Sequence, residues 1–129
     1  MKRTILVVDD DRLMLRITES FIGCGNKDYD VIKADSGKAC IEMLKNEDVV
    51  IDVIMLDYQM PEMDGVHTLK QIRAIPEMKD MKIIFYTSDP KEDIENALKK
   101  VYPDELGQLH YLLKPSSPET ISIAIQSVL

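Results

Sequence analysis

The sequence predicts an α/β fold, a doubly wound sheet of five parallel strands with helices on both faces. Five short apolar runs, most of them rich in Val, Ile or Leu and without polar alternation, are typical of strands buried on both faces. A stretch with helical periodicity follows each run, so strands and helices alternate along the chain. Because parallel strands need right-handed crossover connections, the expected strand order is 2-1-3-4-5.

The N-terminal part of the chain holds the first two expected strands, Ile5–Val8 and Tyr29–Ala34. The apolar stripe expected on the helix between them consists of Leu13, Met14, Ile17 and Phe21. Gly23 and Gly25 mark the end of this helix, since glycine commonly stops a helix. Ser36 is the expected N-cap of the second helix.

Three further strand–helix repeats complete the pattern. The expected strands are Ile51–Leu56, Lys82–Tyr86 and His110–Leu113. Asp64 and Ser117 precede the third and fifth helical stretches, as N-caps do. The apolar stripes of the last three helices are Val66, Leu69 and Ile72, then Ile94, Ala97, Leu98 and Val101, then Ile121, Ala124, Ile125 and Val128. Each of these helices therefore has one face to bury against the sheet.

Length and composition fit one globular domain over residues 1–129, which is either a complete protein or part of a longer one. Lys and Arg number 16 and Asp and Glu number 23, so the net charge is −7 and no basic footprint for direct nucleic-acid binding exists. We expect no membrane partner, because no apolar run is long enough to span a bilayer and no cleavage signal follows the N-terminus. Cys24 and Cys40 match no metal-ligand spacing and no disulfide framework, so the expected location is the reducing cytoplasm.

Polar side chains follow four of the five expected strands, where sheets of this kind hold their ligands. They are Asp9 and Asp10 after the first strand, Asp57 after the third, Thr87 and Ser88 after the fourth, and Lys114 after the fifth. The carboxyl ends of parallel strands meet at one edge of the sheet. Three carboxylates, a hydroxyl and an ammonium group are therefore expected to converge on one crevice.

The carboxylates of Asp9, Asp10 and Asp57 repel one another unless a cation lies between them. Oxygen ligands without His or Cys favour a hard divalent ion, Mg²⁺ or Mn²⁺. Asp11 is expected to cap the first helix and to point elsewhere. A carboxylate beside a metal, a hydroxyl and a lysine also predicts a nucleophile that forms an aspartyl phosphate, with the metal and Lys114 stabilising the charge on the transferred group.

With these residues in place, the sequence closely resembles the receiver domain of two-component response regulators, which has a flavodoxin-like, CheY-like (βα)5 fold. The resemblance rests on four stretches in order at strand ends: "ILVVDD" (5–10), "MLDYQMPEMDG" (55–65), "TS" (87–88) and "KP" (114–115). It covers nearly the whole chain. Each motif alone arises by chance, whereas all four at this spacing are specific.

The resemblance implies a role for each matching acidic residue. Asp57 is the expected phosphoacceptor. Asp9 and Asp10 are expected to bind Mg²⁺ together with Asp57 and the backbone carbonyl of Gln59, and Mn²⁺ is expected to substitute. Gly65 matches the loop after the phosphorylation site, where glycine supplies an unusual backbone conformation.

Further roles concern the phosphoryl group and the switch. Thr87, Ser88 and Lys114 are expected to bind the phosphoryl group. Thr87 and Tyr111 are the expected switch residues, since they match the hydroxyl and the aromatic ring that move on activation. The peptide bond between Lys114 and Pro115 is expected to be cis.

The sequence departs from the usual receiver pattern in one region. Thr87 and Lys114 are separated by 26 residues, a few more than usual, and the extra length lies in "VYPDELGQLH" (101–110). This changes either the fourth helix or the loop after it and leaves the output partner open. Gln59 and Asp89 match positions that vary in the family and tune the lifetime of the phosphate.

The resemblance implies a phosphorylation switch that promotes its own phosphoryl transfer and slow dephosphorylation, rather than a dedicated turnover enzyme. The expected donor is a phosphohistidine of a histidine kinase or histidine phosphotransfer protein, docked on the first helix near Leu13, Met14 and Arg16. After transfer to Asp57, the face formed by the fourth helix, fifth strand and fifth helix changes its affinity for an output protein. A monomer or a phosphorylation-dependent dimer is expected.

Two other functions compete with this one. A phosphatase with an aspartate nucleophile would carry D-x-D and use the second Asp as general acid, but Gln59 occupies that position. An interaction module that keeps the receiver fold without being phosphorylated would be signalled by loss of Asp57, Lys114 or the acidic pair. All of these are present.

Overall fold

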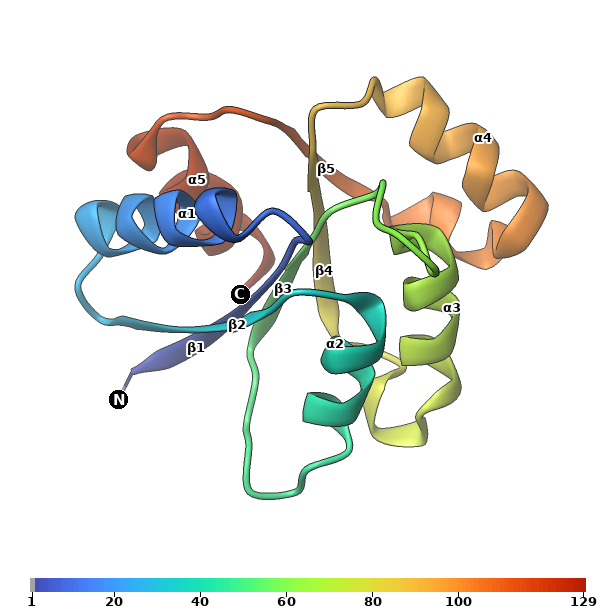
Figure 1. Ribbon diagram of the computed structural model, residues 1–129, viewed down its shortest axis with the longest axis horizontal. Helices are drawn as coiled ribbons and strands as arrows, with labels where there is room; N and C mark the ends of the chain where they lie inside the picture. Colours follow the sequence, from blue (N-terminus) through green and yellow to red (C-terminus); the bar gives the residue numbers. More distant parts are fainter. Residues whose placement is uncertain (1) are drawn as a thin grey trace.

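The computed structural model describes residues 2–129 and confirms the predicted sheet, five parallel strands in the order β2-β1-β3-β4-β5 (Figure 1). The strands are β1 (Arg3–Val8), β2 (Tyr29–Ala34), β3 (Val53–Leu56), β4 (Lys82–Thr87) and β5 (His110–Leu113). The helices are α1 (Arg12–Gly25), α2 (Gly37–Leu44), α3 (Gly65–Ala74), α4 (Lys91–Val101) and α5 (Pro118–Val128), with 3-10 helices η1 (Pro76–Met78) and η2 (Pro103–Gln108). Within residues 2–129, no helix combines the length and the apolar composition that crossing a bilayer requires.

Helices α1 and α5 cover one face of the sheet, and α2, α3 and α4 cover the other (Figure 1). Alternate residues of the central strands divide between the two cores, as in β1, where Leu6 packs toward α2 to α4 and Ile5 packs toward α1 and α5. Strands β1, β3 and β4 are buried on both faces, which explains their continuous apolar runs. The edge strands β2 and β5 are only half-buried.

The predicted helix starts are confirmed, because each capping side chain accepts hydrogen bonds from the first turn of its helix. The caps are Asp11 for α1, Ser36 for α2, Asp64 for α3 and Ser117 for α5. The apolar stripes of α3, α4 and α5 face the sheet as predicted, with Leu69, Ile94 and Ile121 each fully buried. Helices α3 and α5 therefore start and face as the sequence indicates, and α4 faces the sheet as predicted.

Helix α1 differs from its prediction. Its buried face consists of Leu15, Thr18 and Ile22, whereas Leu13 is 63% exposed and Ile17 36%. The predicted stripe was wrong at Leu13 and Ile17, whereas Phe21 is half-buried and packs against the core between the sheet and helices α1 and α5. Helix α1 carries apolar residues on two faces, and their spacing alone does not tell which face packs on the sheet.

The end of α1 agrees with the prediction at Gly25, the last residue of the helix, and differs at Gly23, which lies within it. A Cβ atom on Gly25 would lie 2.9 Å from the carbonyl oxygen of Pro118, so glycine at this position allows α1 to pack closely against α5.

The long segment between Thr87 and Lys114 contains α4 and η2, with α4 ending at Val101. The extra length therefore follows α4 and forms a short helix of its own. Glu105 of η2 is 2% exposed and accepts two hydrogen bonds from the guanidinium of Arg73, each with an N···O distance of 2.9 Å. The same guanidinium donates to the backbone carbonyls of Met78, Lys79 and Met81.

Candidate functional site

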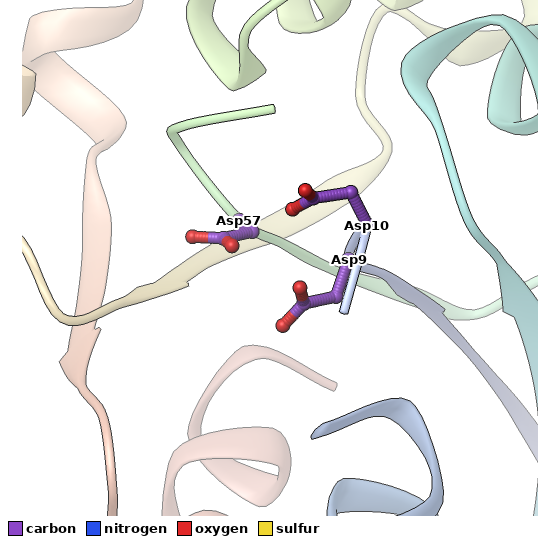
Figure 2. A group of neighbouring side chains, drawn as sticks. All are labelled: Asp9, Asp10 and Asp57. Carbon is purple, nitrogen blue, oxygen red and sulfur yellow. The ribbon is translucent and has the colours of Figure 1, made fainter. Parts of the chain in front are cut away.

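Asp9, Asp10 and Asp57 lie together at the carboxyl end of the sheet, after the neighbouring strands β1 and β3. Backbone hydrogen bonds place them: the N–H of Asp9 donates to Ala34 of β2, and that of Asp57 donates to Val8 of β1, with N···O distances of 3.1 and 3.0 Å. One carboxylate oxygen of each aspartate lies within 4.8 Å of those of the other two. Figure 2 shows the three side chains extending to the same side of the strand ends.

Lys114 joins this cluster from the loop after β5. Its backbone N–H donates to the carbonyl of Thr87 at 2.9 Å, which extends the β4–β5 pairing by one residue. Its Nζ donates to the carboxylates of both Asp9 and Asp57, at 3.2 Å from Oδ2 of Asp57. The side chains of Lys114, Asp9 and Asp57 are only 10%, 4% and 12% exposed.

The site shifts the pKa values of two of these groups. Burial raises the pKa of Asp57, and the negative charge of Asp9 adds to the rise, although the Lys114 ammonium opposes it. Burial alone would lower the pKa of Lys114, but its hydrogen bonds and attraction to Asp9 and Asp57 outweigh burial and raise it. The lysine is therefore an ammonium group at neutral pH.

The donor set fits a hard divalent cation. The three clustered side chains, Asp9, Asp10 and Asp57, offer carboxylate oxygens and no nitrogen or sulfur ligand. When all three are ionised, the single ammonium of Lys114 leaves two negative charges uncompensated. The residues present therefore suit Mg²⁺ in both ligand type and charge, with Asp9, Asp10 and Asp57 as the side chains that would hold it.

The loop that follows Asp57 is shaped by a close backbone approach. A Cβ atom on Gly65 would lie 2.1 Å from the carbonyl oxygen of Asp57, so only glycine lets the start of α3 come this near. The N–H of Gly65 donates to the carbonyl of Tyr58 at 2.6 Å. The prediction that Gly65 supplies an unusual backbone conformation was wrong, because the positive φ in this loop, 68°, belongs to Glu62.

Thr87 ends β4 and is completely buried. Its hydroxyl donates to Oδ2 of Asp89 at 2.8 Å. The other carboxylate oxygen of Asp89 accepts from the side-chain amide of Gln59 at 2.7 Å. The hydroxyl of Tyr111 donates to the backbone carbonyl of Asp89. Asp89 thus connects three residues that the sequence singled out, one on each of three segments around the site.

The remaining residues singled out from the sequence lie at the ends of β4 and β5. Ser88 follows Thr87 and is exposed. The peptide bond between Lys114 and Pro115 is cis.

Two contacts of the site were not predicted from the sequence. One is the role of the Asp89 carboxylate as acceptor for Thr87 and Gln59; the family resemblance marked Asp89 and Gln59 only as variable positions that tune the lifetime of the phosphate. The other is Tyr86, whose ring centroid lies 5.7 Å from Nζ of Lys114. Tyr86 gave no signal, because in the sequence it is one more apolar residue of a buried strand.

Comparison with known protein families identifies the family to which a chain with this fold and this cluster of aspartates belongs. The profile of the family described as "Response regulator receiver domain" matches residues 5–126. The chain belongs to this family. The receiver domain accounts for both the five-stranded sheet and the cluster of aspartates at its edge.

Similarity to individual proteins supports the family assignment. The receiver domain is 35% identical to a "Chemotaxis protein CheY homolog" of Campylobacter jejuni over 127 residues, which span 97% of this chain and 91% of that protein. It is 32% identical to "Transcriptional regulatory protein ZraR" of Escherichia coli over 97% of this chain but only 26% of that protein. The structure of Vibrio cholerae chemotaxis protein CheY4 superposes with a TM-score of 0.82 over 100% of both chains at 26% identity. This receiver is thus similar both to small CheY-like proteins and to one part of longer regulators.

Proposed function

We propose that this receiver is a phosphorylation-controlled switch in which Asp57 accepts a phosphoryl group from a phosphohistidine of a histidine kinase or phosphotransfer protein. The reaction is Mg²⁺-dependent, and Mn²⁺ substitutes for Mg²⁺. The observation that carries the proposal is the position of the Asp57 carboxylate, 3.2 Å from a lysine ammonium and within 4.8 Å of carboxylate oxygens of Asp9 and Asp10, which suit a divalent cation. A nucleophile, a charge-stabilising cation and a metal site thus lie within one small region.

The side chains have separate tasks in the transfer. A carboxylate oxygen of Asp57 forms a bond to phosphorus while the phosphorus–nitrogen bond of the donor breaks, and the imidazole nitrogen keeps the electron pair of that bond. Lys114 is placed to pair with a phosphoryl oxygen, because its ammonium already contacts Asp57. When bound, the divalent cation offsets negative charge on the phosphoryl oxygens. The hydroxyl of Thr87 supplies a further hydrogen bond to the transferred group, and Ser88 lies beside it at the strand end.

Switching follows from the change of partner at Thr87. In the unphosphorylated protein its hydroxyl is bound to Asp89, and Tyr111 is bound to the carbonyl of the same residue. When Thr87 turns to the phosphoryl group, the loop that carries Asp89 and the ring of Tyr111 adjust. The face formed by α4, β5 and α5 then changes its affinity for an output protein, or for a second copy of the domain. Such coupling requires two states of similar free energy, one of which the phosphoryl group favours.

The donor docks on the exposed apolar side of α1. Leu13 is 63% exposed in the first turn of α1, four residues after Asp9, and Ile17 lies one turn further along. Leu13→Ala is expected to slow transfer from a phosphorylated histidine phosphotransfer protein and to leave labelling by acetyl phosphate unchanged. Val50→Ala, which truncates an apolar side chain that is 74% exposed at the opposite end of the sheet, is the control. Equal transfer rates for Leu13→Ala and wild type would place the docking face elsewhere.

The domain acts as a switch and not as a turnover enzyme, because the position two residues after Asp57 lacks a carboxylic acid. Gln59 stands there, and its amide is bound to Asp89. A phosphatase of the D-x-D type needs a general acid at this position. The receiver works in the cytoplasm, a reducing compartment in which the exposed free thiol of Cys24 stays reduced.

The decisive experiment is intact-mass analysis after incubation with acetyl phosphate, with and without Mg²⁺. Wild type and Asp48→Asn are expected to gain one phosphoryl group when Mg²⁺ is present, whereas Asp57→Asn gains none. Asp48→Asn is the matched control, since it makes the same substitution at an exposed residue in the segment before β3. Absence of an adduct in wild type, or an adduct that persists in Asp57→Asn, would contradict the proposal and favour the unphosphorylated interaction module.

A further inference from the structure

Tyr86 neighbours Thr87 on β4 but faces the other side of the sheet. It is 3% exposed and belongs to the core between the sheet and helices α1 and α5. Its hydroxyl lies near the carboxyl end of the strand, where it accepts the backbone N–H of Ser116 at 3.2 Å. The Nζ atom of Lys114 lies over the face of the Tyr86 ring, 5.7 Å from the ring centroid. Tyr86 therefore touches the segment 114–116 at two places.

Both contacts of Tyr86 restrict the position of Lys114, the lysine of the candidate site. A lysine side chain has a flexible four-carbon stem, so its ammonium keeps one position only when surrounding groups restrict it. Asp9 and Asp57 accept hydrogen bonds from the ammonium, and the electron-rich face of the Tyr86 ring, with its centroid 5.7 Å from Nζ, attracts it as well. The hydrogen bond to Ser116 fixes the backbone two residues after Lys114, in the connection between β5 and α5.

We propose that Tyr86 is a positioning residue for Lys114. Its ring confines the ammonium to the space beside Asp9 and Asp57, and its hydroxyl holds the loop from which Lys114 extends. The lysine is then oriented before a phosphoryl group arrives, which lowers the entropy that the transfer step loses. The inference rests on the proposed function for the task of Lys114, whereas the contact between Tyr86 and Lys114 stands independently of it.

Two substitutions separate the contribution of the Tyr86 ring from that of its hydroxyl. Tyr86→Phe keeps the ring and removes the hydrogen bond to Ser116, and Tyr86→Leu removes both. The rate of Mg²⁺-dependent adduct formation with acetyl phosphate is expected to fall about fivefold in Tyr86→Phe, the effect of one ordinary hydrogen bond. A fall of more than about tenfold is expected in Tyr86→Leu, because the cation–ring contact is lost as well. Tyr29→Phe is the control, since Tyr29 is a buried tyrosine of the same core at the start of β2.

A role in positioning is separated from a role in filling the core by two measurements. In a Lys114→Ala background, Tyr86→Leu is expected to cause no further loss of rate, because the group on which it acts is absent. In ¹³C-lysine NMR spectra, the ε-methylene signals of Lys114, assigned with Lys114→Arg, are expected to show a ring-current shift in wild type and Tyr86→Phe. That shift is expected to disappear in Tyr86→Leu.

The possible failures are distinguishable. If wild type forms no adduct, the proposed function fails, and the NMR measurement still tests the contact of Tyr86 with Lys114. If wild type forms the adduct and both Tyr86 variants react at the wild-type rate, the positioning role is refuted. An equal loss of rate from Tyr86→Leu with and without Lys114 also refutes it, since Tyr86 would then act on the fold in general. If Lys114→Ala reacts too slowly to measure, an unchanged Lys114 signal in Tyr86→Leu refutes it.

Discussion

The Asp89 carboxylate binds two side chains that follow or end the neighbouring strands β3 and β4. It accepts hydrogen bonds from the hydroxyl of Thr87 at 2.8 Å and from the amide of Gln59 at 2.7 Å. Thr87 cannot bind a phosphoryl oxygen with the same hydroxyl proton until it leaves Asp89. Under the proposed function, this one hydrogen bond therefore opposes the activated conformation.

Removing the carboxylate should make activation easier. We predict that Asp89→Ala binds beryllium fluoride, a phosphoryl analogue, about tenfold more tightly than wild type in the presence of Mg²⁺, because a hydrogen bond to a charged group contributes roughly 1.5–3 kcal/mol. Titrations followed by NMR measure the affinity. Glu92→Ala, which removes an exposed carboxylate from the first turn of α4, should leave the affinity unchanged. Weaker binding in Asp89→Ala would show that Asp89 supports the activated state.

The two cysteines should differ in reactivity. Burial raises the pKa of the Cys40 thiol from 9.0 to about 12, whereas Cys24 is exposed. At pH 8 about one Cys40 in ten thousand is a thiolate, the form that reacts. We predict that a disulfide reagent such as DTNB titrates one thiol in the native protein and two in urea, and none in native Cys24→Ser.

The same pKa shift has a consequence for stability. The folded-state pKa of Cys40 lies above that of the unfolded chain, so its contribution to stability is complete below pH 9 and is lost as the pH rises toward 12. If DTNB reacted with Cys40 in the native protein at pH 8, that result would contradict the burial of Cys40.

The sequence placed some site residues correctly and missed others for a physical reason. Asp9, Asp57 and Lys114 were predicted to meet because strand ends alone bring them to one edge. The contacts of Tyr86 and Asp89 depend on where a side chain points once the strands have twisted and the loops have closed. Such contacts leave no periodic signal in the chain.

Helix α1 shows how apolar periodicity can select the wrong face. Both Leu13 with Ile17 and Leu15 with Ile22 lie at helical spacing, and only the second pair is buried. Packing against β1 and α5 decides between the faces, and this information is not local to the helix. A second apolar face left exposed is consistent with its proposed use for docking a donor.

Element η2 shows where extra residues are accommodated. The longer segment 101–110 leaves α4 with a regular apolar face, and the added turn is tied to α3 by the ion pair of Arg73 and Glu105. Both side chains are buried, at 4% and 2% exposed. Because the guanidinium also binds three backbone carbonyls around η1, this one pair connects α3, η1 and η2.

Breaking the pair should destabilise the fold. We predict that Glu105→Gln lowers the free energy of unfolding by about 3 kcal/mol, since it leaves the Arg73 guanidinium buried without an opposite charge. Urea denaturation measures the change. Asp104→Asn, at the exposed neighbouring residue, is the control and should alter stability by less than about 0.5 kcal/mol. A loss below about 1 kcal/mol in Glu105→Gln would mean that water compensates the guanidinium.

The architecture as a whole was predictable because several independent features of the sequence require the same sheet. Apolar runs buried on both faces, N-caps at helix starts and right-handed crossovers all require the same sheet, and the strand order followed from them. The same topology concentrates negative charge: a chain of net charge −7 brings three of its carboxylates to one edge, against a single lysine. The stability of the molecule should therefore depend on the metal.

We predict that Mg²⁺ raises the melting temperature of wild type, because binding to the folded state alone stabilises it by about 2.7 kcal/mol at 100 times Kd. Asp10→Asn should have two opposite effects. Asp10 is exposed and clustered with Asp9 and Asp57, while the lysine contacts only the latter two. Without metal, the substitution removes repulsion and should raise Tm by a few degrees, for a gain of about 1 kcal/mol or less. With Mg²⁺, the gain in Tm should be smaller than in wild type, because one ligand oxygen has lost its charge.

Asp48→Asn distinguishes this local effect from a general effect of net charge. It makes the same change in charge at an exposed residue ahead of β3, at the other end of the sheet. If the metal-free Tm of Asp48→Asn rises as much as that of Asp10→Asn, the gain reflects relief of the overall charge, and the local repulsion is negligible. The other outcome is that only Asp10→Asn has a higher Tm without Mg²⁺ and a smaller rise in Tm when Mg²⁺ is added. The carboxylates of Asp9, Asp10 and Asp57 are then held together by the fold against their mutual repulsion. The fold then retains, in its metal-free state, a site that becomes favourable only when a cation binds.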